Sequence, residues 1–271
     1  MNDFKHKKKY GQNFLRDSNI VSRIVSISGV TRDDLVIEVG PGKGILTKEL
    51  AKNSKKVISY EIDEDLVSHL DTVKDNFDNI TFIYDDFLNR EIKEDIKDIS
   101  YQHIYFISNV PYYITTPILM KLMDSGISFE KIIMMVQKEV GERFSAKPKS
   151  KNYSSITVYL NYYYDIVKEF NVGRNEFTPP PNVDSCIVSL TRKKELIPLK
   201  DKDHFFQLVR DSFQFKRKNI KNNLKNYNLE LVEKVLIKNG YQLTSRAEEL
   251  PLDVFIEISN RLLDKYLNNG G

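Results

Sequence analysis

The fold of this chain is decided by the stretch Leu35-Val36-Ile37-Glu38-Val39-Gly40-Pro41-Gly42-Lys43-Gly44. Its first half is a short, mostly apolar run typical of a buried strand, and the glycines that follow turn the chain towards a helix predicted over Ile45 to Asn53. Glycine lets the backbone N–H groups of such a turn approach a ligand closely, because no side chain stands in the way. Nicotinamide enzymes, flavoproteins and ordinary tight turns share this pattern, so the stretch alone indicates a fold and leaves the ligand open.

Downstream of this stretch, short β-rich runs alternate with helical segments, which predicts an α/β fold built on an open parallel sheet. Further helices are expected over Glu64 to Asp75 and over Pro117 to Met123, the second with Thr116 as its cap and Gly126 just past its end. An earlier amphipathic helix, Asp17 to Ser28, is expected to pack across the sheet edge. The strands are predicted at Leu35 to Gly40, Lys56 to Asp63, Ile80 to Asp86, Ile104 to Asn109 and Lys131 to Gln137.

The second half of the chain changes character. Ile156 to Leu160 and Cys186 to Leu190 have the pattern of strands with no long helix between them, and we predict that they close the same sheet as antiparallel strands. A linker-like break at about Arg192 to Asp203 divides the chain into a sheet domain, 1–192, and a smaller all-α C-terminal domain, 193–271. The helices of that domain are predicted at His204 to Phe215, Lys216 to Lys225, Leu229 to Asn239 and Leu252 to Tyr266, with a disordered end from Asn268 to Gly271.

The composition is that of an ordinary globular protein, with 41% hydrophobic and 29% charged residues. The apolar runs are far shorter than the roughly 20 residues that cross a bilayer, and the basic start, Met1 to Lys9, lacks the apolar stretch of a signal peptide. One cysteine, Cys186, excludes an internal disulfide and a cysteine-rich zinc site, and the four histidines have no metal-ligand spacing. We therefore expect a cytoplasmic protein without a membrane partner or a metal.

Positive charge is gathered in two places, although the net charge is only +3. Segment 216–225 contains five bases and no acid, and a second basic cluster lies within the first ten residues. Such clusters indicate a phosphate-binding face, while a solvated helix surface or a frayed tail gives the same pattern. The bases are Lys216, Arg217, Lys218, Lys221 and Lys225, with Lys5, Lys7, Lys8 and Lys9 near the start.

Acidic residues stand at the ends of two predicted strands. Glu61 follows Gly40 by 21 residues, at a place where a carboxylate accepts both ribose hydroxyls of an adenosine. Asp86 ends the third strand and is placed to accept from an adenine amino group. Either acid has the plainer interpretation of a polar strand-end residue. Ligands of such sheets bind outside the carboxyl ends of the strands, however, and the glycine loop and both acids meet there.

The fourth strand ends in Asn109-Val110-Pro111-Tyr112. The Asn109 amide oxygen and the Val110 carbonyl can each accept one N–H of an exocyclic amine, Pro111 stiffens the turn, and the Tyr112 ring can stack on a base. This set meets the needs of methyl transfer to an amine, although Asn and Pro are also ordinary turn residues. No histidine is persuasively placed as the proton relay of a dehydrogenase, so the sequence favours S-adenosylmethionine over a nicotinamide cofactor.

Seven ordered motifs run along the chain, at Gly11 to Leu15, Glu38 to Gly42, Asn109 to Tyr112, Gln137 to Val140, Phe177 to Ser185, Phe213 to Lys218 and Arg246 to Leu250. Together they resemble a known family over nearly the whole length, the ribosomal RNA adenine N6-dimethyltransferases that modify two adjacent adenines near the 3′ end of small-subunit rRNA (the KsgA/RsmA group). Two departures are mild: Val110 stands where the family more often has leucine, and Lys216 where arginine is common. Lysine is a point charge, so Lys216 would weaken a bidentate phosphate contact.

The resemblance implies a Rossmann-like class I S-adenosylmethionine-dependent methyltransferase domain at 1–192 and an RNA-binding domain at 193–271. It implies dimethylation of the two adenines as a late step of small-subunit biogenesis, with small-subunit rRNA as the partner. We expect a monomer, because nothing in the sequence demands a larger assembly. The catalytic set would be Asn109, Val110, Pro111, Tyr112 and Phe177, the two aromatic rings holding the target adenine between them. The cofactor-binding set would be Gln12, Asn13, Leu15, Gly40, Gly42, Glu61, Asp86 and Asn109, and the basic residues of 216–225 would bind RNA.

Two other functions fit part of these motifs. The related large-subunit adenine methyltransferases that confer antibiotic resistance share the glycine loop and the Asn-x-Pro-Tyr type of turn. The motifs that begin at Phe177, Phe213 and Arg246 resemble the small-subunit group instead. A non-catalytic RNA-binding assembly factor could also retain the fold, although the presence of Asn109, Tyr112 and Phe177 argues against it.

Overall fold

The computed structural model describes residues 13–268. The chain divides into two compact units, one formed by the residues up to Gly141 with Val167–Arg192, the other by Glu142–Ile166 with the residues from Lys193 onward. The sequence-based division at 192/193 therefore coincides with one boundary, but 142–166 groups with the second unit. Predicted features at Lys5 to Lys9, at Gln12 and at 269–271 lie outside the described residues.

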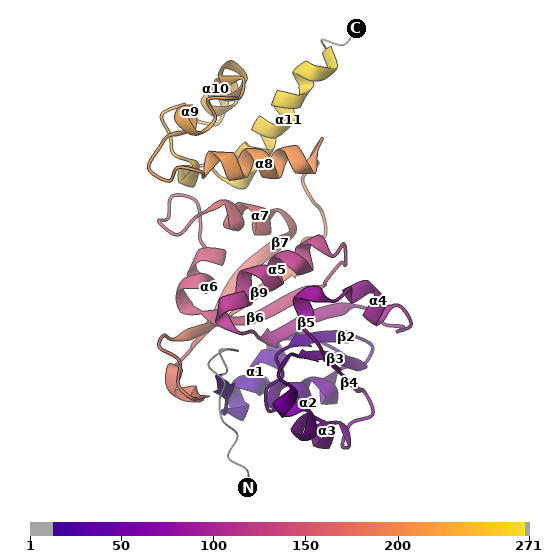
Figure 1. The fold of residues 1–271 in the computed structure, drawn as a ribbon. Helices are drawn as coiled ribbons and strands as arrows, with labels where there is room; N and C mark the ends of the chain where they lie inside the picture. Colours follow the sequence, from indigo (N-terminus) through magenta and orange to yellow (C-terminus); the bar gives the residue numbers. More distant parts are fainter. Residues whose placement is uncertain (1–12, 269–271) are drawn as a thin grey trace. The chain divides into compact units, whose positions relative to one another are not determined.

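A seven-stranded sheet forms the centre of the first unit, and Figure 1 shows its strands. The sheet is mixed: β2 pairs in parallel with β3 and β5, β3 with β4, and β5 with β6, whereas β6 and β9 are antiparallel. Alternating strands and helices thus give the expected α/β sheet. In spatial order the strands are β4 (Ile80–Tyr84), β3 (Lys56–Glu61), β2 (Leu35–Val39), β5 (Ile104–Asn109), β6 (Lys131–Gln137), β9 (Ser185–Arg192) and β7 (Tyr164–Val172).

The strand order reverses between β2 and β5. From β2 the chain proceeds to β3 and β4 on one side of the sheet centre, while β5 and β6 follow on the other side. In open α/β sheets such a switch point leaves a crevice outside the carboxyl ends of the two central strands. The glycine loop follows β2 directly, and Asn109 is the last residue of β5, so both predicted halves of the site open at this crevice.

Helices cover both faces of the sheet. In Figure 1, α1 (Ser18–Ser28), α2 (Ile45–Asn53) and α3 (Val67–Lys74) lie on one side, and α4 (Ile92–Ile96) and α5 (Thr115–Asp124) lie on the other. Asp17 caps α1 by accepting a hydrogen bond from the Asn19 amide at 2.8 Å. Helix α5 begins before the predicted Thr116 cap, so that expectation was wrong. Its Pro117 lies in the first turn, where its missing N–H has no helical partner to lose.

The predicted strand Ile156 to Leu160 is wrong, because Ser155–Tyr163 forms helix α7. The Ser154 amide donates to Thr157 Oγ1 at 3.2 Å, which supports the first turn. The buried face of α7 then packs on α8 (Lys202–Ser212): Tyr159 and Phe206 rings lie 4.3 Å apart between centroids. Tertiary packing overrides the β-preference of this stretch, and the strand that closes the sheet beside β9 is β7.

The second unit is mainly helical and has its own core of Phe205, Val232, Leu250, Phe255 and other buried side chains. The basic segment 216–225 was predicted to be one helix, and this was wrong: residues 213–219 form turns that precede the short helix α9. Asn223 explains the break, since its side chain captures backbone carbonyls of the turn that a helix would use itself. The remaining helices are α6 (Lys138–Phe144), which enters this unit, α9 (Ile220–Asn223), α10 (Leu229–Lys238) and α11 (Leu252–Asn268).

Candidate active site

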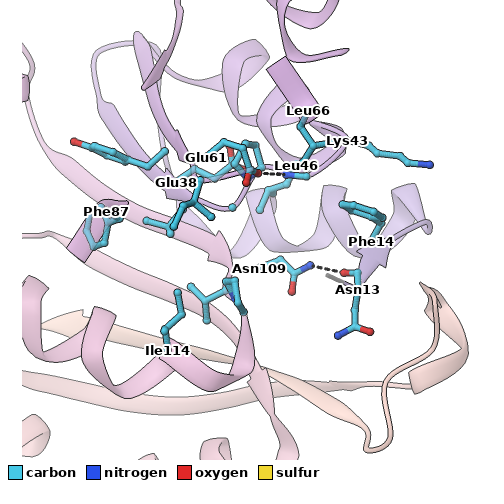
Figure 2. Close-up of a pocket in the computed structure, with 18 of the residues that line it drawn as sticks. Asn13, Phe14, Glu38, Lys43, Leu46, Glu61, Leu66, Phe87, Asn109 and Ile114 are labelled. Carbon is cyan, nitrogen blue, oxygen red and sulfur yellow. Dashed lines mark hydrogen bonds between the residues drawn. The ribbon is translucent and has the colours of Figure 1, made fainter. Parts of the chain in front are cut away.

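A cavity in the first unit opens at the carboxyl ends of the central strands (Figure 2). Glu38 and Glu61 lie along one part of its wall, and Asn109 faces the space beside Asn13. Most of the residues that sequence reasoning selected therefore converge here from distant parts of the chain. The predicted site residues on its wall are Asn13, Leu15, Gly40, Gly42, Glu61, Asp86, Asn109, Val110, Pro111 and Tyr112.

The glycine loop has a backbone that other residues adopt only with strain. Gly40, Gly42 and Gly44 have φ values of +73°, +56° and +71°, in the left-handed region. A Cβ on Gly42 would also lie 2.7 Å from Cδ1 of the Phe14 ring, whereas one on Gly40 would meet nothing closer than 3.6 Å. Gly42 is thus required for space as well as for conformation.

Glu61 is held rigidly at the end of β3. Its Oε2 accepts from the Gly42 amide at 3.4 Å and its Oε1 from the Asp63 amide at 2.9 Å. The residue is 6% exposed, and this burial raises the pKa of its carboxyl. The carboxylate therefore ties the glycine loop to β3 and lies at the cavity wall, where hydroxyl donors of a ligand can reach it.

Glu38 is a cavity residue that sequence reasoning did not select. It lies within β2, 1% exposed, and its Oε2 accepts from Thr47 Oγ1 at 2.7 Å and from Ser59 Oγ at 2.9 Å. Burial raises its pKa to about 7. An acid inside an otherwise apolar strand was the sequence signal for it, because a buried carboxyl needs a local reason to be there.

Asp86 ends the segment after β4 and caps the short 3₁₀ helix Phe87–Asn89. Its Oδ1 accepts from the Leu88 amide at 2.9 Å. Side chains nearby give the cavity an apolar wall next to this carboxylate: Phe87 is 3% exposed, while Ile62 is 42% exposed. An apolar wall with a carboxylate at its edge suits a purine ring that has an amino group.

Asn109 is oriented by the backbone of Asn13, the residue before strand β1 (Phe14–Leu15). Its Nδ2 donates to the Asn13 carbonyl oxygen at 3.4 Å, the contact dashed in Figure 2. With the nitrogen engaged in this way, Oδ1 is left as the acceptor for a ligand. Ser108, just before Asn109, joins the ends of β2 and β5: the Val39 amide donates to Ser108 Oγ at 3.3 Å, and this hydroxyl donates back to the Val39 carbonyl. Val110 is 1% exposed, so only its backbone is available for chemistry.

Tyr112 follows on the 3₁₀ turn Tyr112–Ile114 and is half-buried at the cavity. Its phenol oxygen shares a short hydrogen bond with the hydroxyl of Ser185, a fully buried residue of β9. Burial raises the pKa of Tyr112, so the phenol remains neutral. The Tyr112 ring is therefore fixed at one end by the backbone of the turn and at the other by the hydrogen bond of its hydroxyl.

Comparisons with known proteins identify the family of this chain. The sequence profile of ribosomal RNA adenine dimethylases matches residues 3–264 of the chain. The ribosomal RNA small subunit methyltransferase A of Bacillus licheniformis is 39% identical over 274 residues, which cover 97% of this chain and 94% of that protein. This chain belongs to the ribosomal RNA adenine dimethylase family.

Two solved structures resemble this dimethylase closely. A dimethyladenosine transferase from Plasmodium falciparum has a TM-score of 0.76 and 25% identity, covering 95% of this chain and 98% of its own. The 23S rRNA methyltransferase ErmE also has a TM-score of 0.76, with 27% identity over 92% of this chain and 99% of its own. The predicted Rossmann-like methyltransferase fold is thereby confirmed.

As a dimethylase of this family, the chain is an S-adenosylmethionine-dependent rRNA methyltransferase, as the sequence predicted. The cavity fits that cofactor. The Glu61 carboxylate at the end of β3 can accept hydrogen bonds from ribose hydroxyls, and the apolar wall beside Asp86 suits the base of an adenosine. The glycine loop lines the same cavity, and a Cβ on Gly42 would displace the Phe14 ring of its wall.

Phe177 of the dimethylase lies in the core and not on the cavity wall. It is 1% exposed and belongs to the short strand β8 (Phe177–Thr178), which pairs with β1 (Phe14–Leu15) in the register Leu15↔Phe177. The resemblance implied a ring facing the target base. In this structure the ring packs instead with Leu15, Val172 and other buried side chains.

The predicted RNA-binding residues of the dimethylase all lie in the second unit and are exposed: Lys216, Arg217, Lys218, Lys221 and Lys225. Within residues 13–268, no group of three or more His, Cys, Asp or Glu side chains is arranged to hold a metal ion. No helix in the same range combines the length and apolar character that spanning a membrane needs.

Proposed function

We propose that this enzyme transfers two methyl groups to the N6 amine of each of two adjacent adenines near the 3′ end of small-subunit rRNA, late in the assembly of that subunit. The observation that carries the chemistry is the Asn109 amide, whose nitrogen is engaged by the Asn13 carbonyl so that its oxygen serves as an acceptor. The 39% identity to a small subunit methyltransferase supports the choice of substrate.

Positioning accounts for the reaction in this proposal. S-adenosylmethionine supplies a methyl group on a positively charged sulfur, which an amine can attack directly. Asn109 Oδ1 and the Val110 carbonyl each accept one N–H of the adenine amine and so aim its lone pair, while the Tyr112 ring stacks on the base. No general base is needed, because the amine can lose its proton after the attack, and orientation with fixed dipoles supplies the acceleration.

The exposed bases of segment 216–225 would contact the phosphates of the RNA. Phosphate contacts of this kind make binding weaken as salt rises, because counterions released from the RNA compete. A cytoplasmic location and a monomeric state, both predicted from the sequence, belong to the same proposal, since one chain supplies the glycine loop, Glu61 and the turn from Asn109 to Tyr112 and the proposed substrate is a ribosomal particle.

The large-subunit alternative has one observation in its favour, the likeness to the 23S rRNA methyltransferase ErmE. At 27% identity this likeness is weaker than the 39% identity to a small subunit methyltransferase. The comparison therefore favours the small subunit, and both particles belong in the test.

The experiment offers labelled S-adenosylmethionine with small and large subunits that lack the modification, followed by mapping of the labelled nucleotides. We expect N6,N6-dimethyladenosine at two neighbouring positions near the 3′ end of the small-subunit rRNA only. Asn109→Ala is the control: it should leave cofactor binding mostly intact and transfer no label. Label in the large subunit, or no label from a wild-type protein that binds the cofactor, would refute the proposal.

A further inference from the structure

The loop Phe213–Lys218 presents an aromatic ring to solvent among cations. Phe215 is 56% exposed, and Lys216, Arg217 and Lys218 directly after it are exposed too. An isolated exposed apolar side chain needs no explanation by itself. This ring differs because the three residues that follow it all carry positive charge and because its loop is held in a defined conformation.

Asn223 holds this loop by hydrogen bonds from its side chain to the backbone. It is 9% exposed, and its Oδ1 accepts from the Phe215 amide at 3.2 Å. Its Nδ2 donates to the Ser212 carbonyl at 2.7 Å and, at 3.4 Å each, to the carbonyls of Phe215 and Lys218. One side chain thus satisfies backbone groups at the start, middle and end of the loop, on both sides of the exposed ring.

Further contacts fix the same loop. The Lys218 amide donates to the Phe215 carbonyl at 2.8 Å, which closes a turn, and Lys216 Nζ donates to the Lys151 carbonyl at 3.1 Å. At the base of the loop the Phe213 ring packs 6.0 Å from that of Tyr153. A loop fixed before binding loses little conformational entropy when a ligand arrives, so it is suited to recognition.

The charges indicate which ligand the loop suits. Segment 213–225 contains five bases and no acid, and none of the hydrogen bonds that hold the loop neutralises a charge, because they all end on backbone groups or on an amide. Neighbouring cations repel one another unless an anion lies between them. An aromatic ring beside cations suits a single nucleotide, which has a flat base to stack and phosphates on either side.

We infer that the Phe215 ring stacks on an unpaired base of ribosomal RNA, with Asn223 as the positioning residue that holds the loop. This inference rests on the proposed function, since it takes the rRNA substrate as the partner. It adds a base-stacking contact to the phosphate contacts already assigned to the neighbouring cations.

The first experiment measures binding of the full-length protein to small subunits that lack the modification, across a range of salt concentrations. Stacking on one base contributes about 1 to 3 kcal/mol, so Phe215→Ala should raise Kd at least about fivefold, and Phe215→Tyr should stay close to wild type. The slope of log Kd against log salt should not change for Phe215→Ala. For Lys218→Gln the slope should fall by about one, which corresponds to the loss of one phosphate contact. Ile237→Ala, at a 64% exposed apolar residue of α10, is the matched control and should bind normally.

The second experiment tests whether the Asn223 side chain holds the loop. Asn223→Ala should lose amide hydrogen-exchange protection in residues 213–218 and raise Kd, whereas Asn226→Ala, at an exposed amide just after this segment, should do neither. Because Asn223 acts through the loop that carries Phe215, the Kd of the Phe215→Ala/Asn223→Ala double variant should be little higher than that of the single variant with the higher Kd. Full additivity of the two losses would contradict the positioning role.

The two proposals fail in different ways. If the wild type methylates small subunits and Phe215→Ala binds them as tightly as Ile237→Ala does, the stacking inference is overturned and the function stands. If Phe215→Ala weakens binding only through a smaller salt slope, the ring supports the charges and does not stack, which also overturns the inference. If the wild type modifies no adenine of the small subunit, the function itself fails.

Discussion

The phenol of Tyr112 is hydrogen-bonded to the hydroxyl of Ser185, a residue 73 positions later in the chain. Tyr112 follows β5 and lines the cavity, whereas Ser185 begins β9 and is fully buried. A strand at the far side of β6 therefore holds the tip of the ring that the proposed reaction uses to stack on adenine. The end of the Phe177 to Ser185 motif acquires a physical role through this contact.

Removing the hydroxyl at Ser185 should impair the RNA half of the reaction alone. We expect Ser185→Ala to lower kcat/KM for small subunits about fivefold to tenfold, since one hydrogen bond contributes about 1 kcal/mol, and to leave the cofactor Kd unchanged. Ser185→Thr should retain activity. Ser189→Ala is the matched control, because Ser189 is also buried on β9 but donates to Glu169. Equal losses in the two alanine variants would show that only the stability of β9 matters.

A methyl group on Gly42 should abolish cofactor binding. The residue has φ +56°, and a Cβ there would lie 2.7 Å from the Phe14 ring at the cavity wall. Gly29→Ala provides the control, since Gly29 has φ +73° and nothing within 4 Å of a Cβ. Backbone strain should cost both variants about 1 kcal/mol of unfolding free energy, and Gly42→Ala should lose more because the Phe14 ring must shift. Only Gly42→Ala should lose affinity in calorimetric titration with S-adenosylmethionine. Normal affinity in Gly42→Ala would exclude the loop as the cofactor cradle.

Local signals predicted the central strands well. The strands β5 and β6 were predicted with their observed bounds, and β2 to within one residue, because each is an apolar run of strand length that ends at a turn. Glu61 and Asn109 were found for the same reason: in a parallel sheet, the chain order of strand ends determines which side chains share the crevice. The order of strand ends along the sequence was therefore sufficient to predict that these two residues lie at the crevice.

Contacts between distant segments escaped prediction. The β-preference of Ile-Thr-Val-Tyr-Leu predicts a strand where helix α7 forms, because the packing of this segment on α8 decides the helix. The hydrogen bonds from Asn223 to the loop backbone and the hydrogen bond between Tyr112 and Ser185 likewise depend on which backbone and hydroxyl groups meet in space. Phe177 illustrates the converse, since its motif indicated a base contact while its pairing with Leu15 places it in the core.

Glu38 should make stability depend on pH. Its pKa is about 7 in the folded protein because of burial, against an ordinary value of 4.5, so the native state holds a proton that the unfolded chain lacks between these values. The unfolding free energy of the wild type should therefore fall as pH rises through this window. Glu38→Gln removes the titration, while Thr47 and Ser59 can still hydrogen-bond the amide.

Urea denaturation of both proteins at pH 5 and pH 8 measures this effect. We expect the wild type to lose about 2 kcal/mol relative to Glu38→Gln between the two conditions, since one unit of pKa shift corresponds to about 1.4 kcal/mol and relaxation reduces the full amount. Glu61, whose pKa is also raised by burial, is present in both proteins, so most of its contribution cancels in the difference, and what remains is its Coulombic coupling to Glu38. Parallel pH profiles for the two proteins would show that Glu38 does not titrate in this range.

Substitutions at Phe177 separate a core role from a stacking role. The ring is 1% exposed among Leu15, Val172 and other core residues, so Phe177→Leu should cost about 1 kcal/mol of unfolding free energy and Phe177→Ala about 3 to 5 kcal/mol. If packing is its main role, Phe177→Leu should methylate small subunits at nearly the wild-type rate once it is folded. Tyr112→Leu is the comparison, because Tyr112 lines the cavity and its loss should reduce transfer strongly with little effect on stability.

Steady-state methylation and thermal denaturation on the same preparations give both readouts. A stable Phe177→Leu protein whose transfer falls as far as that of Tyr112→Leu would assign the Phe177 ring to the base. The β1–β8 pair would then have to open during catalysis, because in the closed pair Leu15 and Phe177 face each other in register and the ring is covered. Retained activity would instead leave Tyr112 as the ring that stacks on the adenine and Phe177 as the residue that packs behind β1, the strand next to Asn13.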